Sequence, residues 1–194
     1  MNDVTKSKWD GHLYMMLRGA VGGLIAGVVF GVFQMWFLAD AGLPANTIIH
    51  MIATIVQPDE FFAAGTTSLT VGWAVHVSLS ITYGALLGLL AAEFRSNSAR
   101  VALAGFYGLV VYVFNFLLLA PMFYPVFETA NQPFEAVVHI VYGFLLAPFL
   151  VKWRGFMKNE DQLPPIVARA AANAAADSSQ PAHQYTAWDP EQLR

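Results

Sequence analysis

Five polar side chains interrupt apolar stretches of this 194-residue sequence, and their types could support chemistry inside a membrane. They are Gln34, His76, Asn115, Glu135 and His139. An imidazole can bind a metal or a haem iron, or carry a proton. Glu135 precedes His139 by one helical turn, so its carboxylate could orient or charge that imidazole. These five residues form the candidate polar layer.

His76 and His139 allow more than one kind of site. If they face each other across a helical bundle, they could be the axial ligands of a haem b. The small residues one turn later, Ser80 and Gly143, would leave room beside the rings. No third ligand for another metal accompanies them, and we assign no metal site. The interpretation we favour is a structural or gating layer of hydrogen bonds, since polar groups inside a membrane need partners. Haem b and another metal are the alternatives.

Composition and motifs exclude several classes of function. The sequence has no cysteine, which excludes disulfides, thiolate metal sites and iron–sulfur clusters. Its net charge of -3 provides no basic surface for nucleic acid. Patterns of the Ser-His-Asp, HExxH, Walker and dinucleotide-binding types are missing. We therefore expect no catalytic activity of its own and no nucleic-acid partner.

The elements that must position the polar layer are transmembrane helices. Hydrophobic residues make up 57% of the sequence and charged residues 12%, a composition that suits a lipid bilayer. A helix needs about 20 residues to cross the hydrocarbon core. The apolar segments of sufficient length are residues 19–39, 71–92, 101–122 and 134–151. The sequence predicts an all-α membrane protein with four transmembrane helices in an up-and-down bundle.

A shorter helix is predicted for residues 45–56, between the first two transmembrane segments. Its apolar side chains fall on one side and include Ile48, Ile52 and Ile55, whereas His50 falls on the other, exposed side. The segment is too short to cross the bilayer. We expect an interfacial helix that lies on the membrane.

The distribution of cations predicts the orientation. Lys and Arg occur before the first helix, between the second and third, and after the fourth; both other loops carry only acidic charges. The positive-inside rule then places both termini in the cytoplasm, in a multi-pass protein of the cell inner membrane. With this orientation, Gln34 and Asn115 come late in their helices and His76 and His139 early. All four therefore fall in the outer third of the membrane.

Two spacings suggest an internal repeat. A shift of 81 residues aligns Gly27 with Gly108 and Gln34 with Asn115, and a shift of 63 aligns His76 with His139. The sequence therefore predicts two hairpins in the same orientation, related by a pseudo-two-fold axis along the membrane normal.

Ladders of small residues predict where helices meet. The packing residues are Gly19, Gly23, Gly27 and Gly31 in the first helix and Ser80, Gly84 and Gly88 in the second. Close backbone approach across such faces drives helix association in lipid, where the hydrophobic force between helices is small.

Three segments carry a resemblance to a known family. They read WAVHVSLSITYGALLGLL, APMF and FEAVVHIVYGFLLAP. They resemble small, uncharacterised four-helix bacterial inner-membrane proteins of the YagU type, over residues 19–152. The resemblance implies four helices and no established biochemical activity.

The expected organisation is a cytoplasmic segment at 1–18, a transmembrane domain at 19–152 and a cytoplasmic tail at 153–194. The tail is too polar to fold alone, but it carries possible anchors for a protein partner at Tyr185, Trp188 and Leu193. We therefore favour a non-enzymatic membrane subunit or accessory protein that docks other chains of a complex. The alternatives are a haem b or metal-binding electron-transfer subunit and a small-solute or proton pathway through the polar layer.

Overall fold

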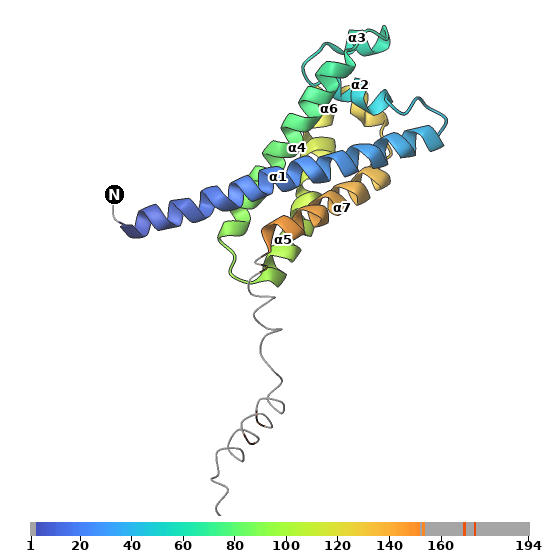
Figure 1. Cartoon of the computed structure of the whole chain (residues 1–194). Helices are drawn as coiled ribbons and strands as arrows, with labels where there is room; N and C mark the ends of the chain where they lie inside the picture. Colours follow the sequence, from blue (N-terminus) through green and yellow to red (C-terminus); the bar gives the residue numbers. More distant parts are fainter. Residues whose placement is uncertain (1–2, 152, 154–168, 170–172, 174–194) are drawn as a thin grey trace, which may run out of the picture. The chain divides into compact units, whose positions relative to one another are not determined.

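A computed structural model describes residues 3–151, 153, 169 and 173, and all regular elements in this part of the chain are helical (Figure 1). The α-helices are α1 (Asp3–Asp40), α2 (Thr47–Ala53), α3 (Asp59–Ala63), α4 (Leu69–Ala92), α5 (Asn97–Tyr112), α6 (Ala120–Phe123) and α7 (Gln132–Leu150). A π-helix, η1 (Val113–Leu119), joins α5 to α6, and a 3-10 helix, η2 (Pro125–Thr129), follows.

Four stretches are long and apolar enough to cross a membrane, as the hydropathy pattern predicts. They are Trp9–Asp40, Leu69–Ala92, Asn97–Phe123 and Gln132–Leu150. The first helix is longer than expected, because α1 begins at Asp3 and not near residue 19. The apolar run marks only the part of a helix that lipid can surround, whereas the helix itself continues until the chain stops it. All four stretches belong to one compact unit, Met1–Val151, and the remainder, Lys152–Arg194, forms a separate unit.

Helices α1 and α4 pack against each other (Figure 1), and small residues of both helices lie at the contact. A Cβ atom at Gly19 would overlap the carbonyl oxygen of Gly84, and one at Gly84 would overlap that of Gly19. A Cβ at Gly23 would overlap the carbonyl oxygen of Ser80. The two backbones are thus in contact at these residues, with Gly88 lying against the backbone of Met15.

Helices α5 and α7 form a second closely packed pair. A Cβ at Gly108 would overlap the carbonyl oxygen of His139, and one at Gly143 would overlap that of Ala104. Helix α1 also lies against α7, where the ring of Phe149 covers Gly22. Two tight hairpins, α1 with α4 and α5 with α7, therefore meet along α1 and α7.

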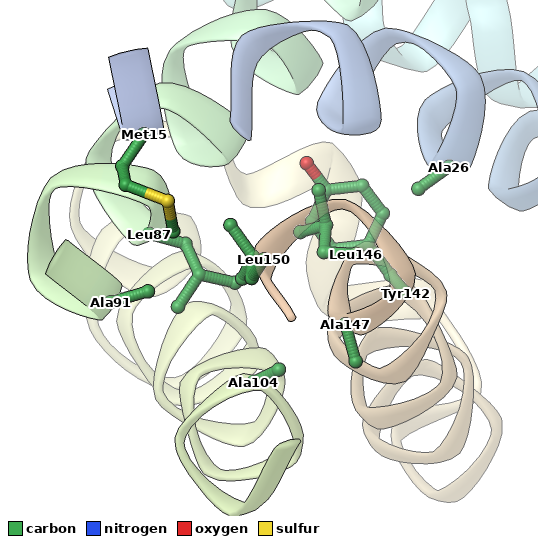
Figure 2. Close-up of a cluster of buried hydrophobic side chains, with 9 residues drawn as sticks. All are labelled: Met15, Ala26, Leu87, Ala91, Ala104, Tyr142, Leu146, Ala147 and Leu150. Atoms are coloured by element: carbon green, nitrogen blue, oxygen red, sulfur yellow. The ribbon is translucent and has the colours of Figure 1, made fainter. Parts of the chain in front are cut away.

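The interior consists of two hydrophobic clusters. Figure 2 shows the first, in which Leu87 and Ala91 of α4 face Leu146 and Leu150 of α7. The second lies toward the other end of these helices and joins α2 to residues that follow η1; it comprises Ile48, Ile49, Met51, Ile52, Ala120 and Phe127. The space between the two clusters is where the candidate site lies.

Helix α2 differs from its expected form. It is seven residues long, and five of its side chains are buried against the protein instead of facing a membrane surface. Ile49 lies so close to α4 that a Cβ at Gly72 would overlap its carbonyl oxygen. His50 was expected to be exposed, but it is half-buried, with its Nδ1 2.8 Å from the Thr67 hydroxyl oxygen. A one-sided apolar pattern indicates burial but does not specify whether lipid or protein covers the helix.

Cationic side chains cap the C-terminal end of α7. Arg100 is buried and donates to the carbonyl oxygens of Leu150 at 2.7 Å and Phe94 at 3.0 Å. Arg18 donates to the carbonyl oxygen of Val151 at 3.1 Å. The last carbonyls of a helix lack intrahelical partners, and cations are favourable there. At the same end, His12 of α1 is paired with Glu93 at the end of α4.

Candidate functional site

A cavity of about 210 Å³ lies between the spanning helices, with α2 and η2 contributing to its wall. Ile48, Ile52 and Phe127 of the second hydrophobic cluster line one side, and Tyr142 of the first cluster lines another. The polar residues of the wall come from all four candidate membrane-crossing stretches and from the segment that follows the third; they are Gln34, His76, Ser80, Tyr83, Asn115, Tyr124, Glu135, His139 and Tyr142. All five residues of the candidate polar layer therefore line one cavity.

Glu135 is the carboxylic acid residue of the cavity wall, and it forms a hydrogen bond with Gln34. The side-chain Nε2 of Gln34 donates a 2.6 Å hydrogen bond to Glu135 Oε2. Both side chains are buried, with exposed fractions of 2% for Gln34 and 3% for Glu135, so the bond is shielded from bulk water. It joins α1 to α7 across the interface between the two hairpins. Sequence reasoning placed the two residues in one layer but missed this pairing.

His139 is oriented by the backbone of Glu135 and not by its carboxylate. Its Nδ1 lies 2.7 Å from the Glu135 carbonyl oxygen, whereas the carboxylate Oε2 is 3.8 Å away. Because a carbonyl only accepts, Nδ1 carries the proton, and in a neutral ring Nε2 is then an acceptor. The expected contact between the Glu135 carboxylate and the imidazole is thus present as the longer of the two, and the hydrogen bond goes to the backbone. A carbonyl one turn earlier in the helix reaches the ring more directly than the flexible side chain does.

His76 makes the corresponding contact to the neighbouring helix. Its Nε2 donates to the carbonyl oxygen of Gly27 at 2.9 Å, a bond that the missing side chain at Gly27 permits. The ring also stacks on Phe30, with centroids 6.2 Å apart, and meets Trp73 edge-on. His76 therefore fastens α4 to α1 directly beside the glycine ladder.

Asn115 lies in the π-helix η1 and has a different partner from Gln34. Its Oδ1 accepts a 2.8 Å hydrogen bond from the Tyr83 hydroxyl. Five of its neighbours in the cavity wall, Val111, Phe116, Leu119, Tyr124 and Phe127, come from the same stretch of chain. A π-turn widens a helix and re-aims its side chains, and such turns are frequent at functional sites. The sequence pattern did not predict this π-turn.

Tyrosine hydroxyls link the hairpins and were missed by sequence reasoning. Tyr142 of α7 donates to the carbonyl oxygen of Ser80 at 3.0 Å, and Tyr107 of α5 donates to that of Tyr83 at 2.9 Å. Ser80 in turn donates to the His76 carbonyl oxygen at 2.7 Å. A buried tyrosine hydroxyl usually finds a hydrogen-bond partner, so the signal available in the sequence was the occurrence of Tyr83, Tyr107 and Tyr142 inside apolar segments.

Both histidine rings have hydrogen-bond and aromatic partners within the protein. Both rings use one nitrogen to hold a backbone carbonyl, and the Phe30 ring packs against both, with centroid separations of 6.2 Å and 4.9 Å. A haem held by both imidazoles would compete with these contacts. In the part of the chain that the structure describes, no group of three or more His, Asp or Glu side chains is placed to hold a metal ion.

Comparison with known proteins gives no match to a family model, to a curated protein or to a solved structure. The resemblance to YagU-type membrane proteins therefore stays a prediction.

The chemistry available in the cavity is that of recognition. A buried carboxylate, an imidazole with an open nitrogen and several hydroxyls are held in place by hydrogen bonds from neighbouring helices. Among the described residues, every fully enclosed side-chain nitrogen or oxygen has a partner. The wall is thus pre-organised, with polar groups at defined positions on an otherwise apolar and aromatic surface, which is the usual composition of a small-molecule site.

Proposed function

We propose that this protein takes a small solute into an intramembrane cavity and belongs to the binding or transport class. The observation that carries the proposal is the convergence of polar side chains from all four membrane-crossing stretches on one cavity that contains a buried carboxylate. Ionisable groups are costly within a bilayer and are retained there mainly for function. A structural role alone would require hydrogen bonds but not a cavity.

The volume of the cavity limits the size of the solute. Its volume of about 210 Å³ lies below the range of roughly 300–1,000 Å³ that is typical for drug-sized ligands. At about 30 Å³ per water molecule in the liquid, it would hold on the order of seven waters. The proposed solute is therefore a molecule of few heavy atoms.

The proposal includes an orientation. The positive-inside rule places Arg18, Arg95 and Arg100 on the cytoplasmic side of a bacterial inner membrane, and both termini with them. The cavity then lies toward the outer face, under α2.

We also propose that the two hairpins are repeats of one unit. The contact of Gly27 with His76 in the first corresponds to that of Gly108 with His139 in the second. The contact of Gly23 with Ser80 likewise corresponds to that of Ala104 with Gly143. These are the pairs that shifts of 81 and 63 residues relate in the sequence. Solute sites of transporters commonly lie at the interface of such repeats.

The docking of other chains remains a second prediction. It depends on Tyr185, Trp188 and Leu193, which lie outside the residues that the structure describes. A haem b protein that uses His76 and His139 likewise stays a prediction, and no step of the present proposal depends on haem.

Accessibility of an introduced cysteine tests the proposal, because the chain has no cysteine of its own. Leu119 is half-buried in the cavity wall, whereas its neighbour Leu118 is 49% exposed on the outer surface of the bundle. With N-(2-hydroxyethyl)maleimide, a small water-soluble thiol reagent, Leu119→Cys in native membranes should react at least tenfold faster than Leu118→Cys. Equal rates for both variants in dissolved, denatured protein provide the control. A Leu119→Cys variant that reacts only after denaturation would show that no solute reaches the cavity.

A further inference from the structure

The charge of the cavity wall is one-sided. Glu135 is the acidic residue that lines it, and no Lys or Arg is among the described residues of the wall. The described cations nearest to the bundle interior, Arg18 and Arg100, hold the carbonyl groups at the far end of α7. A carboxylate buried without a cation is strongly unfavourable when it is ionised. The missing positive charge could therefore be supplied by a solute.

Two polar atoms of the cavity wall are hydrogen-bond acceptors without a partner among the described residues. Gln34 occupies Glu135 Oε2, whereas Oε1 makes no hydrogen bond within the described residues. In that part of the chain, every fully enclosed side-chain oxygen or nitrogen has a hydrogen-bond partner. Because Oε1 has none, it is not fully enclosed and keeps some accessible surface. The same reasoning applies to His139 Nε2, since only Nδ1 of this ring is bonded. A solute that donates hydrogen bonds would satisfy both atoms.

Aromatic side chains form much of the remaining wall. Phe30, Tyr83, Phe116, Tyr124, Phe127 and Tyr142 line the cavity, together with aliphatic side chains from α2. Such rings attract an organic cation through their quadrupole and also accept its apolar part. Inorganic cations fit less well, because they require several oxygen ligands around one point, and the wall offers a single carboxylate.

We infer that the solute is a small organic ammonium ion with a short apolar group, whose ammonium binds between Glu135 Oε1 and His139 Nε2. This inference deepens the proposed function and rests on it. An ammonium group has three donors and one positive charge, which match the open acceptors and the unpaired carboxylate. The apolar group would lie against Phe116 and the isoleucines of α2.

Protection of the introduced cysteine tests the inference. Butylammonium, butyrate and butan-1-ol have the same chain length but differ in charge. Butylammonium at millimolar concentration should slow the reaction of Leu119→Cys with N-(2-hydroxyethyl)maleimide at least fivefold, and butyrate and butan-1-ol should change it less than twofold. Protection is the ratio of the reaction rates without and with the solute in the same variant. A difference in the unprotected rate between variants therefore does not affect the comparison.

Two further variants identify the group responsible. Protection should disappear in Leu119→Cys/Glu135→Gln, where the amide keeps the shape of the carboxylate and can still bond to Gln34. It should persist in Leu119→Cys/Glu128→Gln, which removes the same charge from an exposed position outside the cavity. Equal protection by butan-1-ol, no protection by butylammonium, or full protection in the Glu135→Gln variant would overturn the inference while leaving an accessible cavity in place. A Leu119→Cys variant that does not react at all would instead defeat the proposed function.

Discussion

Arg100 donates a 2.7 Å hydrogen bond to the carbonyl oxygen of Leu150, so that the first turn of α5 caps the last turn of α7. Arg100 as a residue is 2% exposed, and its Nε also donates to the carbonyl oxygen of Phe94, in the loop that precedes α5. Its charge meets the negative end of the α7 dipole. The basic loop therefore fixes the second hairpin in addition to carrying a topology signal.

Replacement of Arg100 should destabilise the protein. Arg100→Leu would leave the carbonyls of Leu150 and Phe94 without their donor, at a cost of about 2 kcal/mol in the free energy of unfolding. Arg95→Leu is the matched control, since Arg95 is exposed and lies in the loop that precedes α5. Both variants remove one positive charge from the same end of α5, so any effect on insertion is shared. Thermal unfolding in detergent would measure the difference; equal midpoints would show that the cap contributes nothing.

The sequence predicts the four spanning helices because bilayer thickness imposes a minimum apolar length. It does not predict the start of α1 at Asp3, since polar residues continue a helix outside lipid without any change in hydropathy. The sequence also does not determine whether lipid or protein covers α2. Whether Ile49 faces lipid or Gly72 depends on packing between segments that are distant in the chain. Such long-range choices are absent from local periodicity.

The glycine ladder supplies a second stability prediction. A methyl group at Gly23 would overlap the carbonyl oxygen of Ser80, so Gly23→Ala should lower the free energy of unfolding by about 1–3 kcal/mol. Gly11 lies in the same helix with nothing within 4 Å of its Cβ position. Gly11→Ala should therefore be neutral or stabilise the helix by up to about 1 kcal/mol. Similar losses in both variants, measured by thermal unfolding, would show that α1 and α4 do not depend on this contact.

Topology can be tested with reporters in the loops. A reporter inserted between Arg95 and Arg100 should read cytoplasmic, and one inserted beside Asp59 or Glu128 should read external, because cations accompany only the first of these loops. Paired reporters that are active on opposite sides of the membrane would measure this. A cytoplasmic reading beside Asp59 would reverse the proposed orientation, and the cavity would then open toward the cytoplasm.

The polar residues of the site are visible in the sequence because they are rare in apolar segments, but their bonds are not. Gln34 and Asn115 occupy equivalent positions under the 81-residue shift, yet one bonds Glu135 and the other Tyr83. The difference accompanies the π-turn at Asn115, which only the third spanning stretch contains. Partner choice depends on the rotation of each helix about its axis, and hydropathy does not determine that rotation.

Deletion of the tail tests the docking prediction. Removal of residues 177–194 should leave the unfolding midpoint of the membrane part unchanged, because the compact unit Met1–Val151 holds all four spanning stretches. Any partner that co-purifies with the full chain through Tyr185, Trp188 and Leu193 should be lost. Trp188→Ala alone should weaken recovery if the aromatic residue is an anchor. Unchanged recovery of the partner after deletion would remove the tail from the docking surface.

Substitution of the histidines separates a hydrogen-bonded layer from a haem site. His76→Gln and His139→Gln keep an amide that can donate to the carbonyl oxygens of Gly27 and Glu135, whereas the alanine variants keep no donor. In a hydrogen-bonded layer, the glutamine variants should retain most of the wild-type stability, and the alanine variants should lose about 2–3 kcal/mol through the lost bond and the space left beside Phe30.

A haem site would respond differently, because glutamine is a poor ligand for haem iron. The absorption spectrum of the purified protein provides the second measurement. A Soret band in the wild type that is lost in both glutamine variants would establish the haem alternative and displace the solute cavity as the main role of these residues. Wild-type stability in both alanine variants would contradict the hydrogen-bonded layer as well, because the contacts to Gly27 and Glu135 would then contribute nothing measurable to the structure.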